Sequence, residues 1–290
     1  MPRPFLLVNP RSGDDSPTVA ELAAEAGRLG VETRELAEGE DAAALAREAA
    51  GRGAPALGMA GGDGSLGAVV EVALEQDLPF ACVPFGTRNH FAKDLGLDDD
   101  PLAALRAFAG EERRVDAGVV NDRVFLNNVS LGIYASFVHD PARKTRNRLL
   151  AALRMVPAAL GRGRRPLALS FEVDGRREQH LALVALVANN DYSLTTMADL
   201  GERTRLDEGL LHAYVIEAVG RAALLRVFAK AVQGRATEAR GWVEWAAEGF
   251  TVELPHGRVH AAVDGEPVVL APPLLFALRP RALRALVPRA

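Results

Sequence analysis

The sequence predicts a two-domain protein in which an N-terminal α/β domain is followed by an all-β domain. Short apolar runs alternate with amphipathic segments to about residue 115, which is typical of a parallel sheet with crossover helices. Beyond that point, this alternation gives way to apolar runs separated by turn-forming residue pairs, which indicate a β-sandwich. The length of 290 residues is sufficient for two domains, each with its own core.

The first domain is expected to alternate strands and helices. The run Phe5–Val8 is short and apolar and leads into a turn-forming cluster, as a buried strand does where it enters a loop. Residues 17–30 carry apolar side chains at helical spacing and end at a glycine. By the same criteria we expect strands at 31–36, 56–60 and 80–83 and helices at 41–50 and 66–76.

The second domain is expected to consist mainly of strands. A hairpin is predicted around Asn121 and Asp122, and Asp-Gly, His-Gly and Glu-Gly pairs separate later apolar runs. One helix is expected at about 221–233. The predicted strands are 167–173, 181–188, 210–216, 250–254, 258–263 and 268–270.

Composition and charge limit the class of protein. Apolar residues make up 49% and charged residues 25% of the chain, an ordinary balance for a soluble globular protein. The longest purely apolar run, Leu181–Ala188, is far below the roughly 18 residues needed to span a bilayer. A net charge of −4 does not indicate a nucleic-acid partner. Because the N-terminus lacks a secretory signal and the single cysteine, Cys82, fits a reducing compartment, we expect a cytoplasmic protein.

A glycine-rich turn follows the strand expected at 56–60. Glycines permit positive φ and close approach, so such a turn at the start of a helix can direct several backbone N–H groups at a phosphate. An aspartate there would repel the phosphate unless a divalent cation lay between them, which indicates a nucleotide with Mg²⁺. The alternative is a tight turn whose aspartate only caps the helix. The turn consists of Gly61, Gly62, Asp63, Gly64 and Ser65.

Two more polar loops that contain glycine follow the first and the last of these strands. Because the carboxyl ends of parallel strands lie at one edge of a sheet, where ligands bind, the three loops together predict a nucleotide site. The site is not a P-loop, since no GxxxxGK[ST] pattern occurs. One loop is Asn9, Pro10, Arg11, Ser12 and Gly13, and the other includes Gly86, Thr87, Arg88 and Asn89.

Six motifs occur along the chain in a characteristic order. The three loops have the forms NPxSG, GGDG[ST] and GTxN, and three later motifs lie at 127–132, 205–210 and 264–266. In this order and at roughly these separations, they resemble the diacylglycerol kinase catalytic domain. That family includes bacterial lipid kinases, sphingosine kinases and ceramide kinases, and it is distantly similar to NAD kinase and phosphofructokinase.

The resemblance implies a domain division and a nucleotide site. The α/β domain, 1–115, would be Rossmann-like, similar to NAD kinase and phosphofructokinase, would bind ATP with Mg²⁺, and would be joined by the C-terminal segment 274–290. The β-sandwich, 116–273, would hold the lipid substrate. Nucleotide-binding positions in the family match Asn9, Pro10, Arg11, Ser12, Gly13, Gly61, Gly62, Asp63, Gly64, Ser65, Thr87, Arg88 and Asn89.

The resemblance also implies catalytic and metal-binding residues. In the Asp-Gly-Glu tripeptide, Glu266 or Asp264 would accept the proton of the lipid hydroxyl; the alternative is a plain hairpin turn, for which Asp-Gly is a common signal. The segment 205–210 resembles a loop that holds a structural Mg²⁺, and a simple turn is nearly as good an interpretation. Its ligands would be Glu208, Asp207 and the carbonyl groups of Arg205 and Leu210.

Two residues depart from the family pattern. Family members usually carry aspartate where this chain has His90, and glycine where it has Arg88. His90 cannot supply a fixed negative charge, whereas Arg88 could contact phosphate directly. An altered acceptor, a rearranged metal site or reduced activity would each be consistent with these changes. They motivate a second hypothesis, a nucleotide-responsive lipid-binding protein with little turnover; a third is a soluble-substrate kinase resembling NAD kinase.

A basic segment offers a contact with membranes. Residues 141–166 hold eight basic residues and no acidic residue, and four apolar residues within them fall at helical spacing. A helix of this kind could lie at an anionic surface, where each nearby Arg or Lys contributes about 1 kcal/mol; the alternative is a solvated basic segment. Since the resemblance implies a lipid substrate, this segment could provide peripheral contact with an anionic membrane surface. The exposed edges of a sandwich also allow a homodimer.

Overall fold

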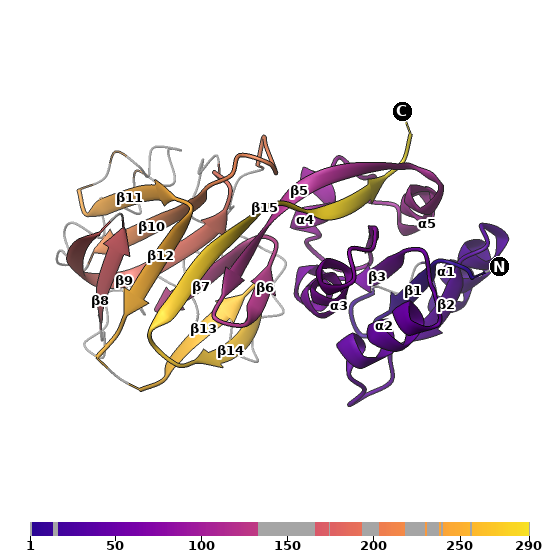
Figure 1. The fold of residues 1–290 in the computed structure, drawn as a ribbon, viewed down its shortest axis with the longest axis horizontal. Helices are drawn as coiled ribbons and strands as arrows, with labels where there is room; N and C mark the ends of the chain where they lie inside the picture. Colours follow the sequence, from indigo (N-terminus) through magenta and orange to yellow (C-terminus); the bar gives the residue numbers. More distant parts are fainter. Residues whose placement is uncertain are drawn as a thin grey trace. The chain divides into compact units, whose positions relative to one another are not determined.

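The computed structural model describes residues 2–13, 17–132, 166–173, 175–192, 203–217, 230, 238, 240–255 and 257–289. The chain forms two compact units, one made of Met1–Ala117 with Arg279–Ala290 and one of Gly118–Leu278. Strands β5 (Glu111–Val120) and β15 (Leu274–Val287) each contribute residues to both units (Figure 1). The predicted combination of an α/β part and an all-β part is confirmed.

The first unit is built on a parallel sheet. Its strands have the order β2-β1-β3-β4, and the last residues of β15 extend the sheet beside β4, also in parallel. The strands β1, β3 and β4 are completely buried, as their uninterrupted apolar runs require of a sheet covered on both faces. The strands are β1 (Phe5–Val8), β2 (Glu32–Glu35), β3 (Leu57–Gly61) and β4 (Phe80–Pro84).

The helices of the first unit begin where the sequence provides caps. Thr18 and Glu21 form a reciprocal capping box at the start of α1, and the Asp41 carboxylate caps α2. The helix α2 packs against α3, whereas α1 packs against α5. The helices are α1 (Val19–Arg28), α2 (Ala42–Gly51), α3 (Asp63–Glu75), α4 (His90–Asp94) and α5 (Pro101–Ala104), followed by a 3₁₀ turn, η1 (Leu105–Ala109).

The helix α3 begins earlier than the sequence predicts. It starts at Asp63 rather than at residue 66, so the second half of the glycine-rich turn is itself the first helical turn. Its N-cap, Gly62, has extended dihedral angles and provides no capping side chain. The first N–H groups of α3 therefore have no hydrogen bond to an N-cap side chain.

The second unit consists of antiparallel strands around one apolar core. Residues that alternate along the strands supply this core, including Phe125, Phe171, Phe250 and Phe276. Phe171 and Phe250 meet edge to face at 6.3 Å between centroids. Its other strands are β6 (Arg123–Phe125), β7 (Asn128–Gly132), β8 (Leu167–Val173), β9 (Arg176–Asn189), β10 (Leu211–Glu217), β11 (Trp242–Ala247), β12 (Gly249–Glu253), β13 (Val259–Val263) and β14 (Glu266–Leu270).

The structure confirms the predicted hairpin and the burial of the single cysteine. The hairpin at Asn121 and Asp122 is present between β5 and β6, and Cys82 is buried in β4, where burial raises the pKa of its thiol. None of the helices in the described part of the chain is long and apolar enough to cross a bilayer. The basic segment 141–166 lies, except for its last residue, outside the described residues, as does nearly all of the helix expected at 221–233.

Candidate functional site

Three loops meet at the carboxyl edge of the parallel sheet in the first unit. The Asn9 side-chain amide donates to the Ser65 hydroxyl at 2.9 Å, and the Ser12 hydroxyl lies 3.3 Å from the same oxygen. Asn9 and Ser12 follow β1, whereas Ser65 lies in the first turn of α3, directly after β3. The hydroxyl of Ser65 thus joins the first two loops, as expected from their positions at the ends of neighbouring strands.

Asp63 connects the glycine-rich turn to the third loop. Its carboxylate accepts hydrogen bonds from the backbone N–H groups of His90 (3.1 Å) and Phe91 (3.0 Å) at the start of α4. Asn89, at a positive φ of 50°, closes the third loop through two hydrogen bonds with the backbone of Gly86. Asp63 therefore caps a helix, but the helix is α4 rather than its own helix α3.

Close backbone contacts explain why glycine occurs in these loops. A Cβ atom added to Gly86 would lie 2.4 Å from the Cα of Gly62, and one added to Gly61 would lie 2.8 Å from the Cβ of Ser65. At Gly13 an added Cβ would lie 2.4 Å from the ring of Phe85. All three distances are shorter than van der Waals contact, so the loops pack together through atoms that only glycine leaves accessible.

We predict that Gly86→Ala lowers the free energy of unfolding by about 1–3 kcal/mol, because the new methyl group must displace the backbone at Gly62. Thermal unfolding followed by far-UV circular dichroism would measure the change. Gly27→Ala is the matched control: it lies within α1, and an added Cβ there meets no atom within 4 Å. Because alanine favours helix, this control should retain or increase stability. Equal stability of the two variants would contradict the packing described.

Two arginines provide positive charge in the loops. Arg11 and Arg88 are exposed, and within the described residues neither forms an ion pair. Thr87, beside Arg88, is also exposed, whereas Asn89 is only 9% exposed. The side chain of Asn89 shapes its own loop. Among the described residues, no ion pair neutralises the guanidinium group of Arg11 or Arg88.

The Asp-Gly-Glu tripeptide forms the turn between β13 and β14 in the second unit. Asp264 and Gly265 both have positive φ, 47° and 84°, as the tight hairpin turn typical of Asp-Gly requires. The Asp264 carboxylate accepts three backbone hydrogen bonds, from Leu126 and Asn127 at 2.8 Å and from Asn128 at 3.0 Å. The tripeptide therefore forms the predicted hairpin turn, and its Asp264 carboxylate also binds backbone N–H groups of another segment.

The two carboxylates of the tripeptide have different surroundings. Asp264 is 8% exposed and its oxygens are engaged by the three N–H groups. Glu266 is exposed at the first position of β14, and its carboxylate has no hydrogen bond or ion pair within the described residues. Glu266 is thus free to accept a proton, whereas Asp264 holds the turn against the segment that precedes β7.

The segment 205–210 is tied to the residues that follow β9. The Glu208 carboxylate accepts from the Asp191 N–H (3.0 Å), and the Leu210 carbonyl accepts from the Asn190 N–H (3.1 Å). The Arg205 guanidinium donates to the Asp207 carboxylate at 3.3 Å. Asp207 is thus paired with a cationic side chain, whereas among the described residues Glu208 and Leu210 accept only from backbone N–H groups; carboxylate and carbonyl oxygens are the donors that Mg²⁺ prefers.

Two protein-family models match the chain and together cover most of its length. The model of the diacylglycerol kinase catalytic domain matches residues 3–120, and the model of the YegS C-terminal NAD kinase beta sandwich-like domain matches residues 128–287. The chain belongs to the diacylglycerol kinase family. The match at 128–287 also agrees with the predicted β-sandwich.

Individual relatives agree with membership of the diacylglycerol kinase family. The chain is 27% identical over 248 residues to a diacylglycerol kinase of Bacillus subtilis, covering 81% of this chain and 80% of that protein. It is 29% identical over 303 residues to a probable lipid kinase YegS-like protein of Pseudomonas aeruginosa, covering 98% and 94%. A crystal structure of a putative diacylglycerol kinase from Bacillus anthracis has the same fold, with a TM-score of 0.76 and 18% identity, covering 98% and 96%.

One residue near the Asp-Gly-Glu turn of this diacylglycerol kinase family member was missed by the sequence reasoning. Arg203 is 4% exposed and donates to the carbonyl groups of Leu126 (2.5 Å) and Asn189 (3.0 Å) and to the Asn127 side chain (2.6 Å). It thereby holds the same backbone segment that binds Asp264. The motif at 127–132 pointed to this segment, but nothing in the local pattern around Arg203 indicated its partners.

Proposed function

We propose that this chain is an ATP-dependent lipid kinase that transfers the γ-phosphate of MgATP to a lipid hydroxyl, with diacylglycerol or a related lipid as acceptor. The observation that carries the proposal is the convergence of three loops at the carboxyl edge of the sheet, joined through Ser65 and Asp63. Membership of the diacylglycerol kinase family, and relatives named as lipid kinases, support the choice of a lipid acceptor.

The loops suit a polyphosphate chemically. The uncapped first turn of α3 presents N–H groups and the positive end of the helix dipole, and both favour an anion. Arg11 and Arg88 add charge that no acidic group among the described residues neutralises. Since phosphoryl transfer depends mainly on positioning and on neutralised phosphate charge, we assign nucleotide binding to the loops after β1, β3 and β4.

We assign proton transfer to Glu266. Its carboxylate would accept the proton of the lipid hydroxyl while that oxygen forms a bond to the γ-phosphorus and the bond from this phosphorus to the bridging oxygen of ADP breaks. Asp264 would instead position Glu266, because its own oxygens are engaged by three backbone N–H groups. The free carboxylate of Glu266 supports this division of roles.

We further propose that Glu208 and the carbonyl oxygens of Arg205 and Leu210 hold a structural Mg²⁺. When bound, this ion would supply positive charge that fixes the segment 205–210. The Mg²⁺ that accompanies ATP is part of the substrate. We propose a cytoplasmic protein that approaches an anionic membrane through the basic segment 141–166, since a lipid acceptor requires contact with a bilayer.

A transfer assay tests the proposed function. The protein would be incubated with γ-³²P-ATP and Mg²⁺ and, in separate reactions, with diacylglycerol, a mixed lipid extract or NAD. We expect the label in a phospholipid, and phosphatidic acid when diacylglycerol is the acceptor. Label in NAD would instead indicate a soluble-substrate kinase. ATP binding without transfer to any lipid would support the second candidate, a nucleotide-responsive lipid-binding protein, which the exposed Arg88 motivates.

A further inference from the structure

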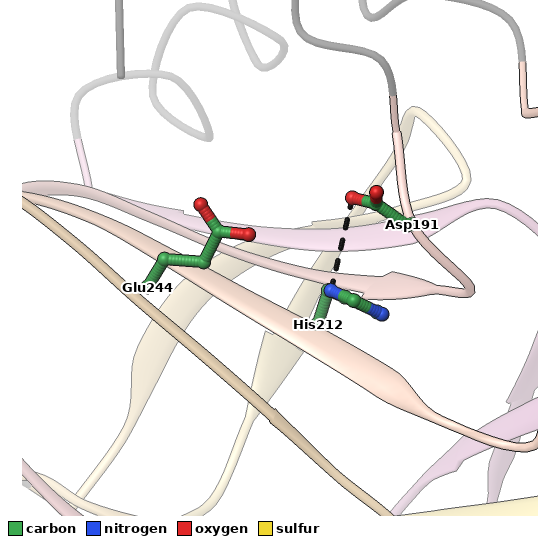
Figure 2. Close-up of side chains that lie close together, drawn as sticks. All are labelled: Asp191, His212 and Glu244. Atoms are coloured by element: carbon green, nitrogen blue, oxygen red, sulfur yellow. Dashed lines mark ion pairs between the residues drawn. The ribbon is translucent and has the colours of Figure 1, made fainter. Parts of the chain in front are cut away.

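One face of the second unit gathers a histidine and two carboxylates. In the pairing of β10 with β11, His212 lies opposite Ala246 and Tyr214 opposite Glu244, so His212, Tyr214 and Glu244 lie on one face of the sheet. The alternate residues of both strands, such as Ala213 and Trp245, pack into the core. Asp191, just after the end of β9, lies on the same side as His212 and Glu244 (Figure 2).

The ligand atoms of Asp191, His212 and Glu244 lie within 4.8 Å of one another. The Nδ1 atom of His212 lies 3.7 Å from an Asp191 carboxylate oxygen, the contact that is drawn dashed in Figure 2. A nitrogen and two carboxylate oxygens this close together form a donor set that divalent transition metals bind.

The imidazole of His212 provides an independent observation. His212 is only 7% exposed, and within the described residues neither of its ring nitrogens has a hydrogen-bond partner. A buried polar atom without a hydrogen bond costs about 1–3 kcal/mol, and a cation shared with the Asp191 carboxylate that faces Nδ1 would remove this cost. A bound cation would use one of these nitrogens.

A neighbouring tyrosine holds one carboxylate of the cluster in position. The Tyr214 hydroxyl donates to the Asp191 carboxylate at 2.6 Å. Burial is the main cause that raises the pKa of the phenol, and this hydrogen bond is the second, so the hydroxyl keeps its proton. The Glu208 carboxylate lies 3.3 Å from the Nε2 atom of His212. Within the described residues this contact is not a hydrogen bond, so both ring nitrogens of His212 remain available to a metal, and Tyr214 is the group that fixes the Asp191 ligand.

We propose that Asp191, Glu244 and the Nδ1 atom of His212 bind a divalent transition metal such as Zn²⁺. Bonds of about 2.0–2.2 Å to zinc require the three ligands to draw together by roughly 1 Å. Glu244 is exposed and lies at the surface of β11, so its side chain can make this movement. The metal would cross-link the end of β9 to β10 and β11, because its ligands Asp191, His212 and Glu244 come from these three places. This proposal does not depend on the kinase function.

Metal titration of the full chain tests the proposal. The protein would first be treated with EDTA and dialysed, and then titrated with ZnCl₂ in a calorimeter in the presence of millimolar Mg²⁺, which occupies oxygen-only sites. We expect saturable binding of a single Zn²⁺ per chain and a higher Tm with the metal, since a ligand that binds only the folded state stabilises it. Co²⁺ should produce visible absorption bands that report a nitrogen-containing site.

Variants distinguish this site from adventitious binding. Glu244→Gln should weaken Zn²⁺ binding about tenfold or more, while the Tm without metal stays unchanged because the side chain is exposed. His212→Asn should have the same effect on binding. Glu248→Gln, an exposed carboxylate in the turn after β11, is the matched control and should bind Zn²⁺ like the original protein. No saturable binding, or equal affinity of Glu244→Gln and the original protein, would overturn the proposal.

Discussion

Glu266→Gln should lower the turnover of phosphate transfer about 10²–10⁴-fold, because glutamine cannot accept the proton of the lipid hydroxyl. Glu266 is exposed and its carboxylate makes no hydrogen bond or ion pair within the described residues. The free energy of unfolding should therefore change by no more than about 0.5 kcal/mol. The ³²P transfer assay, at saturating ATP and with the preferred lipid, measures the effect.

ATP affinity separates a lost base from a lost binding site. The Glu266→Gln variant should bind ATP as tightly as the original protein, because we assign nucleotide binding to the loops of the first unit. Glu248→Gln provides the control for removing one exposed carboxylate from the second unit. Full transfer activity of Glu266→Gln would refute the assignment of the base, whereas loss of activity in both variants would point to a general electrostatic effect.

Asp264→Asn should destabilise the second unit by about 3 kcal/mol, because three buried N–H groups lose their charged acceptor. Asparagine tolerates the positive φ of 47° at this position, so the loss reports the carboxylate rather than backbone strain. Phosphate transfer should also fall, since Glu266 is two residues away in the same turn. Both tryptophans, Trp242 and Trp245, lie in β11, so their fluorescence during urea unfolding reports this unit selectively.

Asp122→Asn is the control for Asp264→Asn. Asp122 also lies in a hairpin turn, between β5 and β6, but its side chain is exposed. Its substitution should change the free energy of unfolding by no more than about 0.5 kcal/mol. If the urea midpoint of Asp264→Asn matched that of the control, the three hydrogen bonds would not contribute as we describe.

The sequence predicted the parts of the protein that depend on local pattern. The alternation of apolar runs and amphipathic segments indicated the parallel sheet, because uninterrupted apolar runs and a 3.6-residue period can be recognised in the chain itself. The Asp-Gly pair indicated the turn that holds Asp264, since only a few residues adopt positive φ readily. The three polar loops could be expected at one edge because parallel strands place their carboxyl ends together.

The tertiary structure decided which distant residues are partners. The sequence indicated that Asp63 could cap a helix, but only the folded loops showed that the helix is α4. Arg203 could not be connected to Asn127 from the sequence, because its guanidinium reaches carbonyl groups on separate strand ends. Likewise, the expected strands gave no information about the register that places Glu244 beside His212. Local periodicity determines which face a side chain occupies, whereas strand order and register depend on contacts far apart in the chain.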